Sequence, residues 1–164
     1  DRANVLKFGA PKTFANSRPN GNLLEQRALS KSRWDAWVRK PEILGDEEDF
    51  VNAKIDQMSD IMKSFGRPFG HRLRLAMKSY VANYPESDRF NGRFKTQTAL
   101  ADQVEMRLLP KLRGVDPDES SQAFGDLSAL IKNELIDDEL AKAIDVSIEN
   151  SRQNAQFNWG GVTR

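Results

Sequence analysis

The sequence predicts an all-α protein, a bundle of about five helices with almost no strand. Apolar residues recur at spacings of three and four over most of residues 46–153, which is the period of an amphipathic helix. Proline or glycine stands at most of the boundaries between these stretches. The chain has 164 residues, of which 38% are hydrophobic and 30% charged, so it is long enough for one globular domain with its own core.

The first 45 residues are the least regular part. Residues 1–8 predict the end of a strand or a short extended segment, and residues 9–22 predict a loop. A short helix is expected near 30–39, and it ends before Pro41. Its apolar positions, at i, i+3 and i+4, are Trp34, Trp37 and Val38.

Two long helices follow. The first begins at Asp46, has acidic residues at 47–49 that suit the helix dipole, and ends at Gly66. The second is expected from about Pro68 to Tyr84, because proline fits the first turn of a helix. The two apolar stripes are Phe50, Val51, Ile55, Met58, Ile61, Met62 and Phe65, then Leu73, Ala76, Met77, Tyr80 and Tyr84.

Three more helices are predicted, over residues 97–109, 119–135 and 138–153. Asp137 or Asp138 caps the last of them. Their apolar positions include Leu100, Val104 and Leu108, then Phe124, Leu127, Leu130 and Ile131, and finally Leu140, Ile144 and Ile148.

Charge is unevenly distributed along the chain although the net charge is only +1. Residues 1–45 hold nine Lys and Arg against four Asp and Glu, which is +5, and residues 116–150 hold two against ten, which is −8. The two ends therefore suit different partners, or each other, unless both are simply solvated surface. Cysteine is absent, which excludes disulfides and thiolate metal sites and favours a cytosolic address.

Several classes of protein are not supported by the sequence. No apolar stretch approaches the ~20 residues that span a bilayer, and no signal peptide is present. One histidine without cysteine leaves no zinc site and no framework for a catalytic triad. Because the chain also has no phosphate-binding loop, it is not expected to be an enzyme by itself. It opens at Asp1 without an initiator Met, as expected of a processed product or a piece of a longer protein.

Arg72 is a candidate anion-binding residue. It falls in the first turns of the helix predicted after Pro68, where the positive end of the helix dipole disfavours a cation. That position is sensible if the guanidinium reaches an anion such as a phosphate. The alternative is an intramolecular salt bridge or a snorkelling side chain. His71, next to it, is expected from the residues alone to be a partly exposed residue at the helix start and not a ligand.

A basic and aromatic stretch is a candidate nucleic-acid site. Cations interleaved with indoles bind phosphates and stack on bases. The alternative is that the two tryptophans pack onto the domain. Arg2, at the predicted strand end, either reaches a neighbouring subunit or forms a surface ion pair. The residues of the stretch are Arg27, Lys31, Arg33, Trp34 and Trp37.

Three segments together resemble one known family. Residues 1–8, DRANVLKF, resemble the segment after the sensor 1 strand of McrB-like AAA+ proteins. Residues 69–72, FGHR, open a helix similar to the sensor 2 helix of the McrB and MoxR groups. Residues 102–114, DQVEMRLLPKLRG, resemble a late signature of that family, a glutamine and an apolar run before Leu-Pro-Lys-x-x-Gly.

The resemblance implies a domain organisation. Residues 1–45 would be the end of an AAA+ core strand followed by a basic insertion with a short helix. Residues 46–114 would be the helical lid with the sensor 2 helix, and residues 115–164 a C-terminal helical extension. Arg72 is similar in position to the sensor 2 arginine that contacts nucleotide phosphates, with His71 beside it. Arg2 falls near the place of arginine fingers, although the run of arginines in some McrB proteins is Val5-Leu6-Lys7 here.

The resemblance also implies a function. Family members are hexameric motors that use ATP or GTP with Mg²⁺ and act with a McrC-like nuclease in the restriction of foreign DNA. The Walker A and Walker B elements would lie upstream of Asp1, so this chain by itself would bind no nucleotide, no Mg²⁺ and no other metal. The alternative is a non-enzymatic helical adaptor that binds DNA or a protein.

Overall fold

The computed structural model describes residues 30–37, 45–85 and 94–162, and these residues form six α-helices and no strand. The predicted mainly-α bundle is therefore confirmed, while the strand and loop predicted over residues 1–22 lie outside the described residues. The α-helices are α1 (Lys31–Trp37), α2 (Asp46–Ser64), α3 (His71–Ala82), α4 (Lys95–Gln103), α5 (Ser121–Ala129) and α6 (Asp138–Arg152). Three short segments extend them: the π-helical η1 (Val104–Leu108) and η3 (Leu130–Glu134), and the 3-10 segment η2 (Leu109–Leu112).

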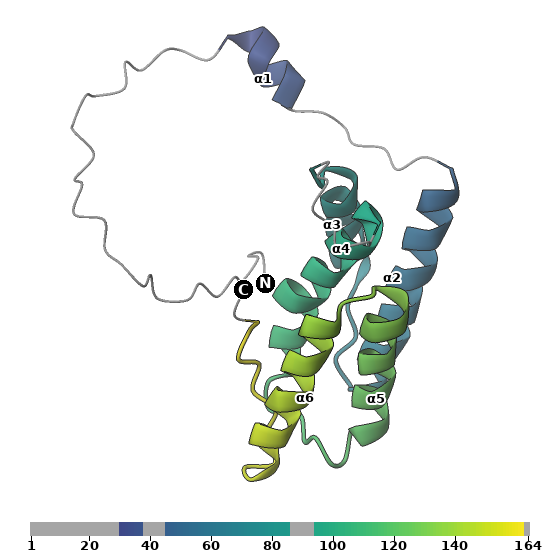
Figure 1. Cartoon of the computed structure of the whole chain (residues 1–164). Helices are drawn as coiled ribbons and strands as arrows, with labels where there is room; N and C mark the ends of the chain where they lie inside the picture. Colours follow the sequence, from purple (N-terminus) through teal and green to yellow (C-terminus); the bar gives the residue numbers. More distant parts are fainter. Residues whose placement is uncertain (1–29, 38–44, 86–93, 163–164) are drawn as a thin grey trace, which may run out of the picture.

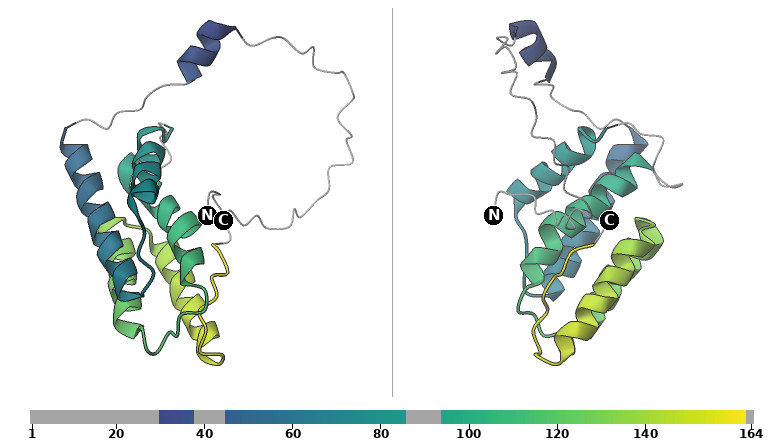
Figure 2. Two further views of the ribbon diagram at one scale, coloured as in Figure 1. Left: turned by 180° about the vertical axis from the view of Figure 1, so that it is seen from behind. Right: turned by 60° about the vertical axis from the view of Figure 1, so that its left-hand side comes forward.

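Helices α2 to α6 make the bundle, whereas α1 lies apart from it (Figure 1). α2 packs against α5, α3 packs against α4, and α6 packs against η3 and α5. Figure 2 shows the same grouping from two further sides. α4 continues through η1 and η2 without a break, so residues 95–112 form one rod whose pitch changes twice.

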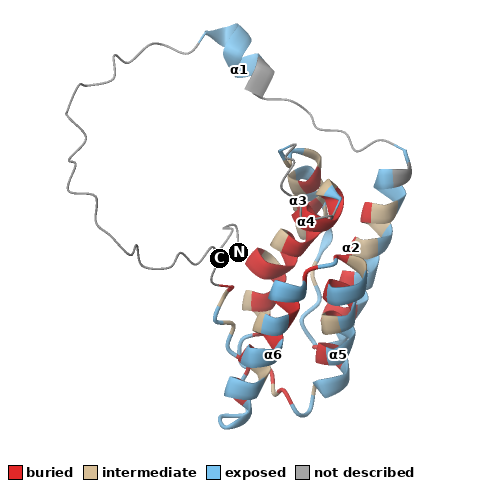
Figure 3. Ribbon diagram, in the orientation of Figure 1, coloured by how far each residue is buried: buried red, intermediate tan, exposed pale blue. Residues whose placement is uncertain are grey.

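The core lies between the inner faces of these helices, as the colouring by burial shows (Figure 3). Three rings join α2, α5 and the C-terminal tail: Phe65 lies 4.7 Å from Phe124, and Phe124 lies 4.9 Å from Phe157, between ring centroids. The tail is anchored because the Phe157 N–H donates to the Val115 carbonyl at 2.7 Å. Burial of these rings removes large apolar areas from water, which is the main stabilising contribution here.

Two predicted helix boundaries are wrong. α3 begins at His71 and not at Pro68, because Gly70 is extended and Phe69 packs against the core before the helix starts. The helix predicted over 97–109 begins earlier, at Lys95, and leaves α geometry after Gln103. The Gln103 side chain is fully buried, and its amide oxygen and nitrogen have no hydrogen-bond partner among the described residues.

Candidate functional site

The turn between α2 and α3 sets the position of the candidate anion site. Gly66 has a φ of +66°, a left-handed conformation that favours glycine, and its N–H donates to the Lys63 carbonyl at 2.8 Å. The Arg67 N–H donates to the Met62 carbonyl at 2.8 Å. These bonds close the end of α2 and turn the chain toward α3.

The first turn of α3 carries the two residues predicted for the site. His71 and Arg72 are both exposed. Arg72 makes no hydrogen bond or ion pair with the part of the chain that the structure describes. Gly70, the N-cap, offers no side chain to the free N–H groups, and the first turn holds no carboxylate. Arg72 therefore lies exposed at a helix start, and the alternative of an intramolecular salt bridge is not found among the described residues.

Arg74 differs from Arg72 in its environment. Its guanidinium pairs with the Asp56 carboxylate of α2, and its side chain is only 30% exposed. Residues two positions apart do not face each other on a helix, so Arg72 points to another side of α3. Arg74 attaches α3 to the bundle, whereas the guanidinium of Arg72 is available to a ligand.

Contacts at the other end of α3 fix its direction. The hydroxyls of Tyr80 and Tyr84 donate to one oxygen of Asp102 on α4, at 3.2 and 2.7 Å. Sequence reasoning placed both tyrosines in an apolar stripe and missed Asp102 as their acceptor. The only signal was their i, i+4 spacing, which puts both hydroxyls on one face. α3 is therefore held along its length while its first turn stays open.

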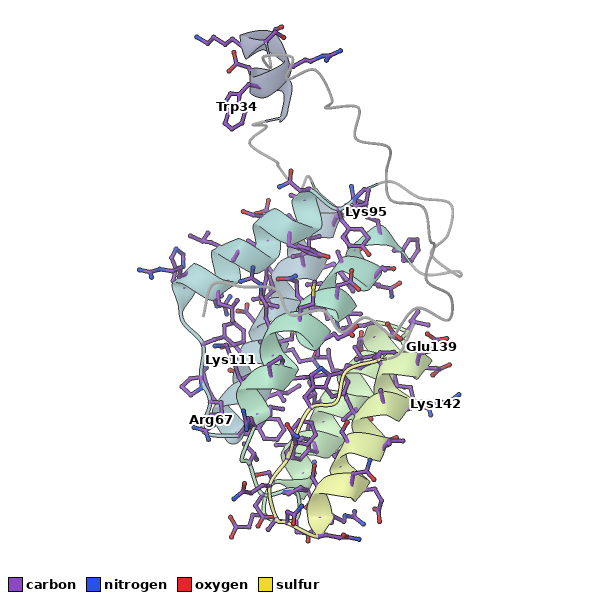
Figure 4. All side chains as sticks on the ribbon, turned by 90° about the vertical axis from the view of Figure 1, so that its left-hand side faces the viewer. Trp34, Arg67, Lys95, Lys111, Glu139 and Lys142 are labelled. Carbon is purple, nitrogen blue, oxygen red and sulfur yellow. The ribbon has the colours of Figure 1, made fainter. Side chains whose placement is uncertain are left out.

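Two further cations lie near this side of the bundle. Arg67, in the α2–α3 turn, is exposed, and Lys111, on η2, is half-buried. Figure 4 shows both on the same side of the molecule in that view. Neither makes an ion pair with the described residues. Each adds positive potential to this side of the molecule, which favours anions.

The basic and aromatic stretch is only partly described. Ser30 caps α1, since its hydroxyl accepts from the Arg33 N–H at 3.3 Å. Lys31 and Arg33 are exposed, and Trp34 is 57% exposed. The expectation that the tryptophans pack onto the domain is therefore wrong for Trp34. The side chain of Trp37, and all of Arg2 and Arg27, lie outside the described residues.

The apolar residues of the segment 102–114 belong to the core. Its leucines Leu108, Leu109 and Leu112 are fully buried, while Arg113 is exposed. Gly114 has a φ of +80° and donates its N–H to the Phe157 carbonyl at 2.9 Å. The glycine is thus required by the turn that receives the C-terminal tail.

Residues 30–37, 45–85 and 94–162, the part of the chain that the structure describes, hold neither a candidate membrane span nor a candidate metal site. Within these ranges no helix combines the length and the apolar character that crossing a membrane requires. The same residues hold no group of three or more His, Asp or Glu side chains that could bind a metal ion.

The fold and the open first turn of α3 define a helical bundle with an exposed cationic edge. Residues 27–156 match the family model described as "Domain of unknown function (DUF8727)". The match spans more than half of the 164 residues, and the chain belongs to this family. No curated protein and no solved structure matches the chain.

Proposed function

We propose that this chain is the helical lid, with its sensor 2 helix, of a McrB-like AAA+ NTPase of the cytoplasm. Arg72 is the residue that carries the proposal. A cation in the first turn of a helix costs about 0.3–1 kcal/mol, and no intramolecular partner among the described residues offsets that cost for Arg72. A bound phosphate would offset it, because guanidinium and phosphate form charge-assisted hydrogen bonds.

The chemistry of this site is electrostatic. Arg72 would donate hydrogen bonds to phosphate oxygens of ATP or GTP and stabilise the charge that develops as the terminal phosphoryl group is transferred. Its angle to the nucleotide would depend on α3, which Asp56 and Asp102 hold against the bundle. The 164 residues contain no phosphate-binding loop. The proposal therefore requires residues outside them to bind the nucleotide and Mg²⁺.

The wider assignments depend on the same proposal. The resemblance to McrB-like proteins supports neighbouring AAA+ subunits in a hexamer, a McrC-like nuclease partner and a role in DNA restriction. His71 would lie beside the phosphates, and Arg2 would serve the next subunit. Neither role is needed for Arg72 to act.

The test is hydrolysis by the protein that the gene of this chain encodes. Replacing Arg72 by Ala should lower kcat for ATP or GTP by about 10²-fold, the scale of removing one preorganised donor to the transition state. Arg74→Ala is the matched control, since that arginine lies two positions along the same helix and pairs with Asp56. Equal rates for the two variants would refute the role of Arg72, and a parent without NTPase activity would refute the motor.

A second candidate function is a nucleic-acid-binding adaptor. The exposure of Trp34, with Lys31 and Arg33 on the same short helix, favours it. Binding of single-stranded DNA would then weaken with salt, because each phosphate contact releases a counterion. Log affinity falls with log salt, and replacing Lys31 and Arg33 by Ala should make this fall shallower, reducing the magnitude of the slope by about 1–2. An unchanged slope would remove this candidate.

A further inference from the structure

A groove at one end of the bundle has an apolar wall that the described chain leaves uncovered. We name it the Phe94 groove. Its volume is about 310 Å³, and Phe94 on its rim is 74% exposed. Single exposed apolar residues are ordinary, but a large ring beside a cavity of this size is typical of a binding surface. The lining residues are Glu47, Phe50, Phe94, Thr96 and Gln97.

The floor of the Phe94 groove is fixed by hydrogen bonds. The Gln97 side chain accepts from the Phe94 N–H at 2.9 Å and donates to the Glu134 carbonyl at 2.8 Å. Lys54 pairs with Glu134 at 2.7 Å and lies 5.4 Å from the centre of the Phe50 ring. Because these polar groups are already satisfied, the groove offers an incoming group mainly apolar contact.

α1 is a helix without a packing partner. It has seven residues, and isolated helices shorter than about 12 residues are marginal in water. Trp34, its largest described side chain, is 57% exposed. The family match begins at residue 27, so α1 belongs to the same family domain as the bundle. A packing site for Trp34 would stabilise α1.

The charges of the two surfaces are complementary. α1 holds Lys31 and Arg33 against Asp35, which is +1. Glu47 lines the groove, and Glu48 and Asp49 beside it are exposed. Lys78 lies 4.0 Å from Glu48, which leaves Glu47 and Asp49 without an ion pair among the described residues. Lys54 and Lys95, the nearby cations, both have partners.

The connection between the two surfaces is short. Seven residues, 38–44, join α1 to Gly45, and Glu47 follows two positions later. Fully extended, seven residues reach at most about 25 Å. A tether of this length gives an effective concentration in the millimolar range, so that even a weak intrinsic affinity would fill the groove. In Figure 4, Lys95, which follows Phe94, lies at the end of the bundle nearest α1 and Trp34.

We propose that α1 docks into the Phe94 groove of its own chain through Trp34. The structure records α1 apart from the bundle, so the docked arrangement is a second state in equilibrium with it. Docking places the indole against Phe50 and Phe94, and brings Lys31 and Arg33 of α1 toward Glu47 and Asp49. A docked Trp34 is not available to stack on a base, so docking and nucleic-acid binding through this residue exclude each other. The proposal is independent of the NTPase assignment.

The test measures how accessible Trp34 is to a quencher in the 164-residue chain. Replacing Trp37 and Trp159 by Phe leaves Trp34 as the single indole, and circular dichroism checks that the bundle is retained. Phe94→Ser in this background should raise the acrylamide quenching constant about twofold, since emptying a half-populated docked state doubles the exposed fraction. Leu75→Ser is the matched control, because Leu75 is 50% exposed on α3 and does not line the groove.

Two further measurements separate the possible occupants. Glu47→Lys should raise the quenching constant as Phe94→Ser does, and 0.5 M salt should have the same effect in the parent, because salt screens the charge contribution. Equal quenching in the parent and in Phe94→Ser overturns the proposal. Protection that grows with protein concentration also overturns it, since α1 would then occupy the groove of a second copy.

Discussion

The first turn of α6 is closed by its own chain, whereas the first turn of α3 is open to solvent. Asp137 caps α6, its carboxylate accepting from the Leu140 N–H at 3.0 Å, and Asp138 and Glu139 add negative charge where the helix dipole favours it. α3 has neither a side-chain cap nor a carboxylate there. Both helices belong to one bundle, so the difference is local. It shows that the chain closes the first turn of α6 with a side chain and leaves the first turn of α3, like that of α5, without a side-chain cap or a carboxylate.

The largest expected effect comes from removing the Asp137 cap at the closed first turn of α6. Asp137→Ala should lower the free energy of unfolding by about 1–2 kcal/mol, because the Leu140 N–H loses its acceptor at a site where the Asp137 side chain is buried. Urea unfolding followed by circular dichroism measures this. Asp138→Ala is the control, since that carboxylate is exposed and contributes only through the dipole. Equal losses in the two variants would mean that the cap is not what distinguishes α6 from α3.

The second effect comes from the residue before the cap. Ile136 has a φ of +53°, a left-handed conformation that is unfavourable for a β-branched side chain, and it is 50% exposed. Ile136→Asn should raise the free energy of unfolding by about 1 kcal/mol, because asparagine tolerates this conformation. The same change at Val146, exposed within α6, should leave it nearly unchanged, because valine and asparagine have similar helix propensities. A loss of stability at Ile136 would show that its side-chain contacts outweigh the backbone strain.

Much of the bundle follows from periodicity alone. Every residue of the stripe predicted for the helix at Asp46 is buried except Phe50, which is half-buried. The boundary at Pro68 was missed because proline suits both a first turn and the extended segment before one. The burial of Gln103 could not be predicted, since its surroundings come from several helices distant in sequence.

The candidate sites were less predictable than the helices. The place of Arg72 in a first turn allowed either an anion contact or an intramolecular salt bridge, and no salt bridge is found among the described residues. Packing of Trp34 onto the domain was the alternative that its i, i+3 spacing with Trp37 suggested, and it is wrong, because the contacts of an indole depend on where the whole of α1 lies. The Phe94 groove had no signal, since Phe94 and Glu47 belong to different helices and only the fold brings them together.

The third prediction concerns the open first turn of α3, where a carboxylate replaces the Arg72 guanidinium. Arg72→Glu should raise the free energy of unfolding by about 0.5 kcal/mol, because a carboxylate suits the first turn and Arg72 has no partner there among the described residues. In the NTPase proposed above, the same variant should lose hydrolysis. Arg74→Glu is the contrast: it places a carboxylate against Asp56 and should destabilise the bundle. A destabilised Arg72→Glu variant would show that Arg72 already serves the fold.

The smallest effect comes from closing α3 with a cap. Gly70 is extended, with φ −92° and ψ −179°, and a Cβ there would have nothing within 4 Å, so serine fits without strain. Its hydroxyl could accept from the N–H of Arg72 or Leu73, and Gly70→Ser should raise the free energy of unfolding by a few tenths of a kcal/mol. Gly66→Ser has the same open space but a φ of +66°, and should lower stability instead. If both variants changed stability in the same direction, the lack of a cap at α3 would not explain its open first turn. Opposite signs would show that a side-chain cap fits the first turn of α3 without backbone strain, whereas the left-handed turn at Gly66 requires glycine.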